Sequence, residues 1–133
     1  MRILGIDPGY ALLGYGVIDT DGRTATAVDY GVVETKAGDP FPERLQRLYD
    51  GVTQLVEMYR PDCAVFEELF FYHNITTAIS VGAGRGVAIL AAQQKGQQEC
   101  YHPTLPRISV ISLSSRIQLL QKLYERLLQV SVL

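Results

Sequence analysis

The 133-residue sequence has two cysteines, no tryptophan and no excess of basic residues. Cys63 and Cys100 lie in unrelated contexts without C-x-x-C spacing, so neither a zinc knuckle nor a disulfide framework is predicted, and we expect Cys63 to be packed. We identify no apolar stretch of about 18 residues that could span a bilayer and no charged-then-apolar leader. We therefore expect one cytoplasmic domain over residues 1–133 that does not contact a membrane.

Charge is divided unevenly along the chain. The net charge is −2, which argues mildly against nucleic-acid binding because a basic excess is the usual electrostatic footprint of such proteins. Residues 1–68, however, hold twelve acidic and six basic side chains, whereas residues 69–133 hold two acidic and six basic ones. The two halves could present faces of opposite sign.

The first third of the chain predicts strands. Arg2–Ile6 is a short apolar run that ends at Asp7, and Gly14–Thr20 alternates large and small side chains. Asp21-Gly22 predicts a hairpin turn, and Thr24–Lys36 predicts a third strand rich in Val and Thr.

The middle of the chain predicts a parallel crossover. From Glu43 the apolar residues recur at helical spacing, until Arg60-Pro61 forbids continuation of the helix. Cys63–Phe66 is then a strand-length apolar run, and Thr76–Lys95 predicts a helix of small residues suited to close packing, including packing across a subunit interface. The order strand, helix, strand beside a hairpin meander indicates an α/β fold with a mixed sheet.

The last part of the chain has a different composition. Residues 97–133 contain neither Gly nor Ala. Arg107–Leu113 can form a strand and Ser114–Val130 an amphipathic helix, with Ser114 as an N-cap.

Two carboxylates follow strands in the same way. Asp7 ends the first strand and Glu67 follows the fourth, and ligands gather at the carboxyl ends of strands in α/β sheets. Asp7 alone would be read as a turn residue that bonds nearby backbone amides. Two acids together favour a bound cation, because unpaired carboxylates are costly to bury side by side. With no Cys or His cluster, the cation would be Mg²⁺, with Mn²⁺ as a substitute.

Three segments together carry a specific resemblance: GIDPG, GYGVID and AVFEELFFYHNITTAISVGAGRGVAILAA. Over about residues 1–96 the chain resembles the RuvC family of bacterial Holliday-junction resolvases. The resemblance implies a ribonuclease-H-like fold, with a mixed five-stranded sheet flanked by helices. It also implies a homodimer that binds a four-way DNA junction, nicks it symmetrically with Mg²⁺ in recombination and repair, and works with the branch-migration motor formed by RuvA and RuvB.

The resemblance also assigns roles to residues. Asp7 and Glu67 match the family's catalytic metal ligands, and Glu68 takes a supporting role because adjacent strand residues point to opposite faces. Phe70 matches the family's base-stacking aromatic, with Phe71 beside it, although core packing is the alternative for each. For Arg85, in GAGRGV, a phosphate contact and a plain helix-surface position are equally compatible with the sequence.

The chain departs from the family after residue 96. The family's acidic ligands in a helix that reads like D-A-A-D-A-L-A are not found, because no Asp follows Asp62 and the only acids after Glu68 are Glu99 and Glu125. A frame change or a truncation would produce this divergent part. With two of four ligands, we expect impaired nuclease activity.

Two other functions remain open. A catalytically silent, dimeric junction-binding module could hold DNA by Arg85, Lys95 and the basic tail. A phosphate-binding fold of the actin-like ATPase or sugar-kinase type is less compatible, because Tyr10-Ala11-Leu12-Leu13 offers no Thr or Ser hydroxyl to a phosphate.

Overall fold

A four-stranded mixed sheet with two helices is the frame of the molecule. The computed structural model describes residues 1–21, 23–67 and 75–95. The elements in chain order are β1 (Arg2–Asp7), β2 (Leu12–Thr20), β3 (Ala25–Glu34), α1 (Phe41–Tyr59), β4 (Cys63–Phe66) and α2 (Ile75–Gln94). The predicted mixed α/β sheet is therefore confirmed, and the fifth strand and last helix expected in residues 107–130 lie outside the described residues.

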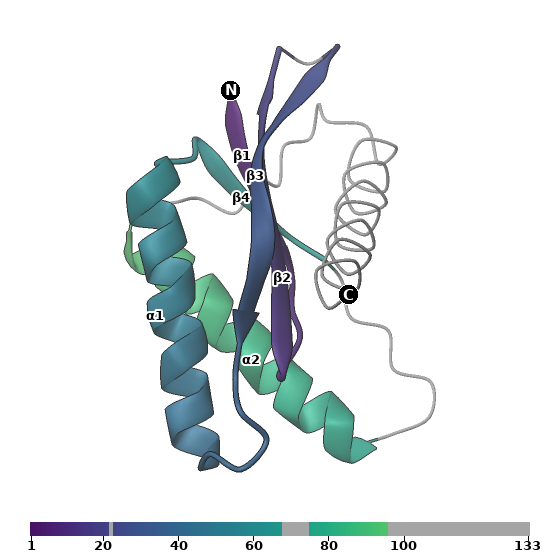
Figure 1. Ribbon diagram of the computed structural model, residues 1–133, viewed down its shortest axis with the longest axis vertical. Coiled ribbons are helices and arrows are strands. Elements are labelled where there is room, and N and C mark those ends of the chain that lie inside the picture. The colour runs from purple at the N-terminus through teal and green to yellow at the C-terminus, as the bar shows by residue number, and fades with distance from the viewer. Residues whose placement is uncertain (22, 68–74, 96–133) are drawn as a thin grey trace, which may run out of the picture.

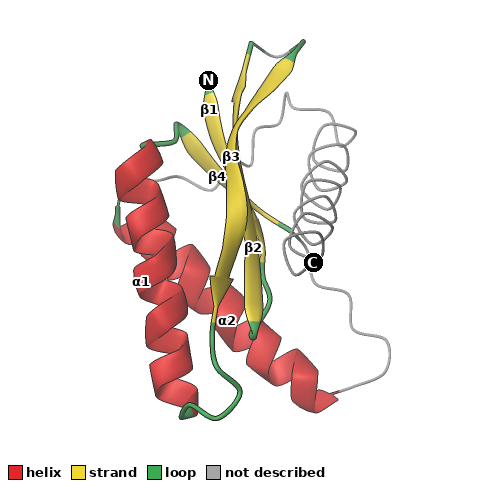
Figure 2. Ribbon diagram, in the orientation of Figure 1, coloured by secondary structure: helices red, strands yellow, loops and turns green. Residues whose placement is uncertain are grey.

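The strand order is β3-β2-β1-β4. The meander β1-β2-β3 is antiparallel, and β4 returns through α1 to pair with β1 in parallel, with Ile3 opposite Cys63 and Ile6 opposite Phe66. α1 and α2 pack against each other beside this sheet (Figures 1 and 2). Because β1 and β4 are parallel neighbours, their carboxyl ends meet at one edge of the sheet.

Helix α1 begins two residues before the predicted start. Pro40 is its N-cap and Pro42 lies in its first turn, where a proline needs no hydrogen-bond partner for its nitrogen and already has a helical φ. Arg60 ends the helix in the left-handed conformation, with φ 46°, and its amide donates to the carbonyl of Val56 at 2.9 Å. Pro61 then directs the chain into β4.

The core lies between the sheet and the two helices. Alternate residues of β1 and β4 contribute Leu4, Ile6, Ala64 and Phe66, and all of them are buried. The remaining members come from β2, α1 and α2: Leu13, Val17, Leu48, Val52, Leu55, Val56, Ala88, Ala91 and Ala92. The alanines of α2 allow it to approach α1 closely, which accounts for the small residues noted in the sequence.

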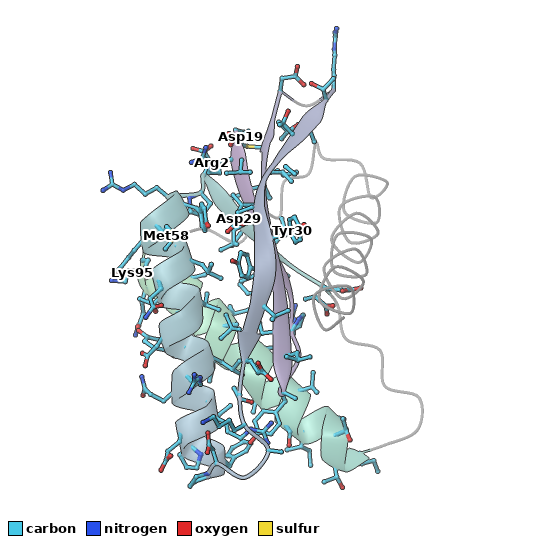
Figure 3. All side chains as sticks on the ribbon, in the orientation of Figure 1. Arg2, Asp19, Asp29, Tyr30, Met58 and Lys95 are labelled. Atoms are coloured by element: carbon cyan, nitrogen blue, oxygen red, sulfur yellow. The ribbon has the colours of Figure 1, made fainter. Side chains whose placement is uncertain are left out.

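Polar contacts fasten the end of the sheet opposite to the carboxyl ends of β1 and β4. Arg2 forms a forked ion pair with Asp19 of β2, with Nε–Oδ1 at 2.9 Å and Nη2–Oδ2 at 2.8 Å (Figure 3). Its Nη1 also donates to the carbonyl of Tyr59, at the end of α1. Asp29 of β3 accepts hydrogen bonds from the hydroxyls of Tyr15 and Tyr59, so α1 is tied to the sheet near Asp29 as well.

One expectation from the sequence is corrected and another is confirmed. α2 is long and apolar enough to cross a membrane by length and composition alone, although no such stretch was expected. One side of it packs in the core described above, as the apolar side of a helix in a globular domain does. Cys63 is buried, as predicted.

Candidate metal centre

The two predicted acids lie side by side at the carboxyl ends of β1 and β4. Ile6 pairs with Phe66 in the parallel register, so Asp7 and Glu67 are the next residue on each strand. The Glu67 amide donates to the Ile6 carbonyl at 2.9 Å, which extends the strand pairing by one step. The predicted convergence of these carboxylates therefore follows from the pairing of β1 with β4.

The turn after Asp7 is held tightly. A Cβ on Gly9 would lie 1.9 Å from the Leu12 carbonyl oxygen, so no side chain fits there. Arg44 of α1 stacks its guanidinium 3.7 Å from the centre of the Tyr10 ring and donates to the Thr35 hydroxyl at 3.0 Å. That hydroxyl in turn donates to the Tyr10 carbonyl at 2.7 Å. The turn therefore fixes where β1 ends and where its carboxylate begins.

The surroundings of Asp7 disfavour the negative charge of its carboxylate. Burial above all, then the charge of Glu67 and a hydrogen bond shared with that carboxyl, together raise the pKa of Asp7 from 3.8 to about 6. Asp7 therefore holds a proton more readily than an isolated Asp would. A divalent cation would relieve the same repulsion that the proton relieves.

The pair fits a hard cation. Mg²⁺ usually takes one or two protein carboxylates and completes its octahedron with water and substrate phosphate oxygens. Among residues 1–21, 23–67 and 75–95, no group of three or more His, Cys, Asp or Glu side chains forms a closed cage. Two carboxylates at the edge of the sheet therefore match a Mg²⁺ site in which water and substrate oxygens supply the rest of the coordination.

The other predicted site residues have different outcomes. Arg85 lies in α2 and is partly buried, with its Nε donating to the main-chain carbonyl of Glu67 at 3.3 Å. It is therefore not a plain surface arginine, and its contact with a phosphate stays a prediction. Glu68, Phe70 and Phe71 lie outside the described residues.

Sequence reasoning missed two supporting residues. Gly84 of α2 comes close to the turn after Asp7, because a Cβ there would lie 3.9 Å from the Gly9 carbonyl oxygen and 3.1 Å from Leu48. Arg44 holds the same turn from α1 through Tyr10. The GAGRG string offered a signal for Gly84, whereas nothing in the spacing of Arg44 distinguishes it from an ordinary helix residue.

Comparison with known proteins agrees with this geometry. The family described as crossover junction endodeoxyribonuclease RuvC matches residues 3–131. The chain belongs to the RuvC family. Among curated RuvC proteins, that of Brevibacillus brevis is 51% identical and that of Chloroflexus aggregans 52% identical over 96 residues. Both alignments cover 72% of this chain and 58% of the relative.

Solved structures give the same assignment. The RuvC of T. thermophilus in complex with a Holliday junction substrate superimposes with a TM-score of 0.68 at 34% identity, over 73% of this chain and 62% of that one. The yeast mitochondrial Holliday junction resolvase Ydc2 has a TM-score of 0.54 at 15% identity, which shows a shared fold alone.

The RuvC match has an uneven extent along the chain. This chain spans less than two thirds of the length of the curated relatives named above, and those alignments cover 96 residues. The family match nevertheless continues to residue 131. The divergence expected beyond residue 96 stays a prediction.

Proposed function

We propose that this chain is a RuvC-type endonuclease that resolves four-way DNA junctions in recombination and repair, with Mg²⁺ or Mn²⁺ as cofactor. The observation that carries the proposal is the pair Asp7 and Glu67 at the carboxyl ends of adjacent parallel strands. The matching family and the curated relatives are named crossover junction endodeoxyribonucleases, which supports junction cleavage.

Each candidate residue has a separate role in the proposed reaction. Asp7 and Glu67 would hold the cation between them, each fixed by its strand end. Bound there, Mg²⁺ would supply positive charge to a scissile phosphodiester and favour in-line attack by water. By the family match, Phe70 and Phe71 would stack on unpaired bases at the junction centre, and Glu68 would support Glu67.

We propose further that the activity of the 133-residue chain is impaired. Its described part brings two carboxylates together, and the sequence supplies no Asp after Asp62. A missing ligand commonly costs about 10²-fold in rate or more. A silent junction-binding module is the corresponding alternative function. Lys95, which that alternative used for DNA, forms an ion pair with Glu57 of α1 in this structure.

A synthetic four-way junction with end-labelled strands tests both versions. Mg²⁺-dependent nicks in two strands of like polarity, lost in Glu67→Gln, are the expected result for a nuclease. The matched control is Glu34→Gln, which neutralises an exposed carboxylate at the end of β3. Gel-shift binding of the junction with no nicking at high enzyme and Mg²⁺ concentration would favour the silent module instead.

The proposal includes a homodimer formed through α2. Its exposed side carries Ile75, Ile79 and Leu90, which are 81%, 66% and 50% exposed, and helical spacing aligns them with Gly82 and Gly86. Apolar side chains this exposed are typical of an interface. Sedimentation of the full chain should give a dimer, and Ile79→Lys should give a monomer. By resemblance, the partners would include the RuvA and RuvB motor, and the location would be the cytoplasm.

A further inference from the structure

We propose that Arg85 is a positioning residue that fixes the Glu67 carboxylate through the main chain of Glu67. The proposal rests on the metal centre proposed above and names the part of α2 that shapes it. Its basis is a set of contacts that join α2 to both strand ends.

Glu67 is the first residue after the end of β4. β4 ends at Phe66, and the Glu67 amide donates to the Ile6 carbonyl of β1. The carbonyl of Glu67 accepts from Arg85 Nε at 3.3 Å. Both main-chain groups of Glu67 are thus held, the amide by β1 and the carbonyl by α2, and its Cα lies between the two anchors.

Gly84, the residue before Arg85 in α2, lies close to the turn that follows Asp7. Gly84 is buried, and a Cβ there would lie 3.1 Å from the Leu48 side chain and 3.9 Å from the Gly9 carbonyl oxygen, so the helix backbone runs beside that turn. Consecutive residues of one helix therefore contact the segments that follow β1 and β4. A rigid helix that spans both segments holds the distance between Asp7 and Glu67 more firmly than the parallel pairing alone.

The two roles considered for Arg85 from the sequence need different atoms. A phosphate contact depends on its positive charge, whereas positioning depends on an N–H three carbons from Cα. Gln carries its side-chain nitrogen at the same bond position as Arg Nε, without the charge. Lys carries the charge but has a carbon at that position. Arg85→Gln and Arg85→Lys therefore separate the two roles, and Arg85→Met removes both.

The experiment measures cation binding, junction binding and stability separately. Mn²⁺ bound to the full-length chain is counted from the electron paramagnetic resonance signal of free Mn²⁺, without DNA. Junction affinity is measured in EDTA by gel shift, and the free energy of unfolding by urea. Arg47→Met, which alters an exposed arginine of α1, is the control for general loss of charge. Glu67→Gln gives the background for Mn²⁺ on other carboxylates.

Positioning predicts that Arg85→Gln binds Mn²⁺ as the wild type does, while Arg85→Lys and Arg85→Met lose about tenfold or more, in the range known for partners that orient ligands. Equal loss in Arg85→Gln and Arg85→Met, or a loss of junction affinity that Arg85→Lys restores, would overturn it in favour of a charge contact. Unchanged Mn²⁺ affinity in all three variants would overturn it outright. If the wild type itself bound no Mn²⁺ above the Glu67→Gln background, that result would refute the proposed metal centre itself, and the role of Arg85 with it.

Discussion

Asp7→Asn should stabilise the metal-free protein at neutral pH even as it disables the cation site. Burial and the nearby Glu67 raise the Asp7 pKa from 3.8 to about 6, so the folded state holds this proton more tightly than the unfolded state does. Stability therefore falls as pH rises through this interval, and the penalty is complete above about pH 6. The penalty disappears only well below the unfolded pKa of 3.8, where the carboxyl is protonated in both states, and near pH 4 only a small part of it remains.

The size of the effect follows from that shift. About two pKa units correspond to about 3 kcal/mol. We reduce this to about 1–2 kcal/mol, because Asp7 is only partly buried and water screens the repulsion. Asn has nearly the same shape and no charge, so the variant should exceed the wild type by about that amount at pH 8 and come close to it near pH 4.

Urea unfolding followed by circular dichroism, in EDTA at several pH values, measures this difference. The comparison of variant with wild type cancels the other titrating groups, and Glu34→Gln is the matched control for removal of a carboxylate at a strand end. Adding Mg²⁺ should then stabilise the wild type and leave Asp7→Asn unchanged, because only the intact pair binds the cation. A difference between Asp7→Asn and wild type that is zero, or equal at pH 4 and pH 8, would refute the electrostatic account.

Two further substitutions test the frame of the site. Gly9→Ala should lower the free energy of unfolding by about 1–3 kcal/mol, because its Cβ would meet the Leu12 carbonyl oxygen at 1.9 Å. Gly38→Ala, where nothing lies within 4 Å, is the control, and equal urea midpoints for the two would contradict this reading. Leu4→Ala empties a fully buried position and should cost about 2–5 kcal/mol by the same assay, with a loss below about 1 kcal/mol excluding a packed core there.

Much of the fold was visible in local patterns. The order of strands and helices, the Pro-Gly turn, the end of α1 before Arg60 and the acids at the carboxyl ends of β1 and β4 depend on residues close in sequence, and the structure has each of them. β2 begins two residues before its predicted start, and β3 ends two residues before its predicted end. The start of α1 was placed too late, because prolines were read as breakers where the first turn of a helix accepts them.

The supporting contacts could not be read in this way. The bond from Arg85 to the Glu67 carbonyl joins residues 18 positions apart through a helix whose rotation the sequence does not define. The stacking of Arg44 on the Tyr10 ring could not be predicted either, because it depends on how α1 crosses the sheet. Such contacts appear only when elements are placed in space, whereas the acids were predicted because strand ends have a fixed direction.

The parallel pairing of β1 with β4 has a consequence for when the candidate metal site can form. Asp7 and Glu67 are separated by sixty positions in the chain, with β2, β3 and α1 between them. Closing so long a loop is among the slow and late steps of folding. In a nascent or partly unfolded chain the two carboxylates therefore stay apart, so the proposed cation site exists only in molecules in which β4 has paired with β1.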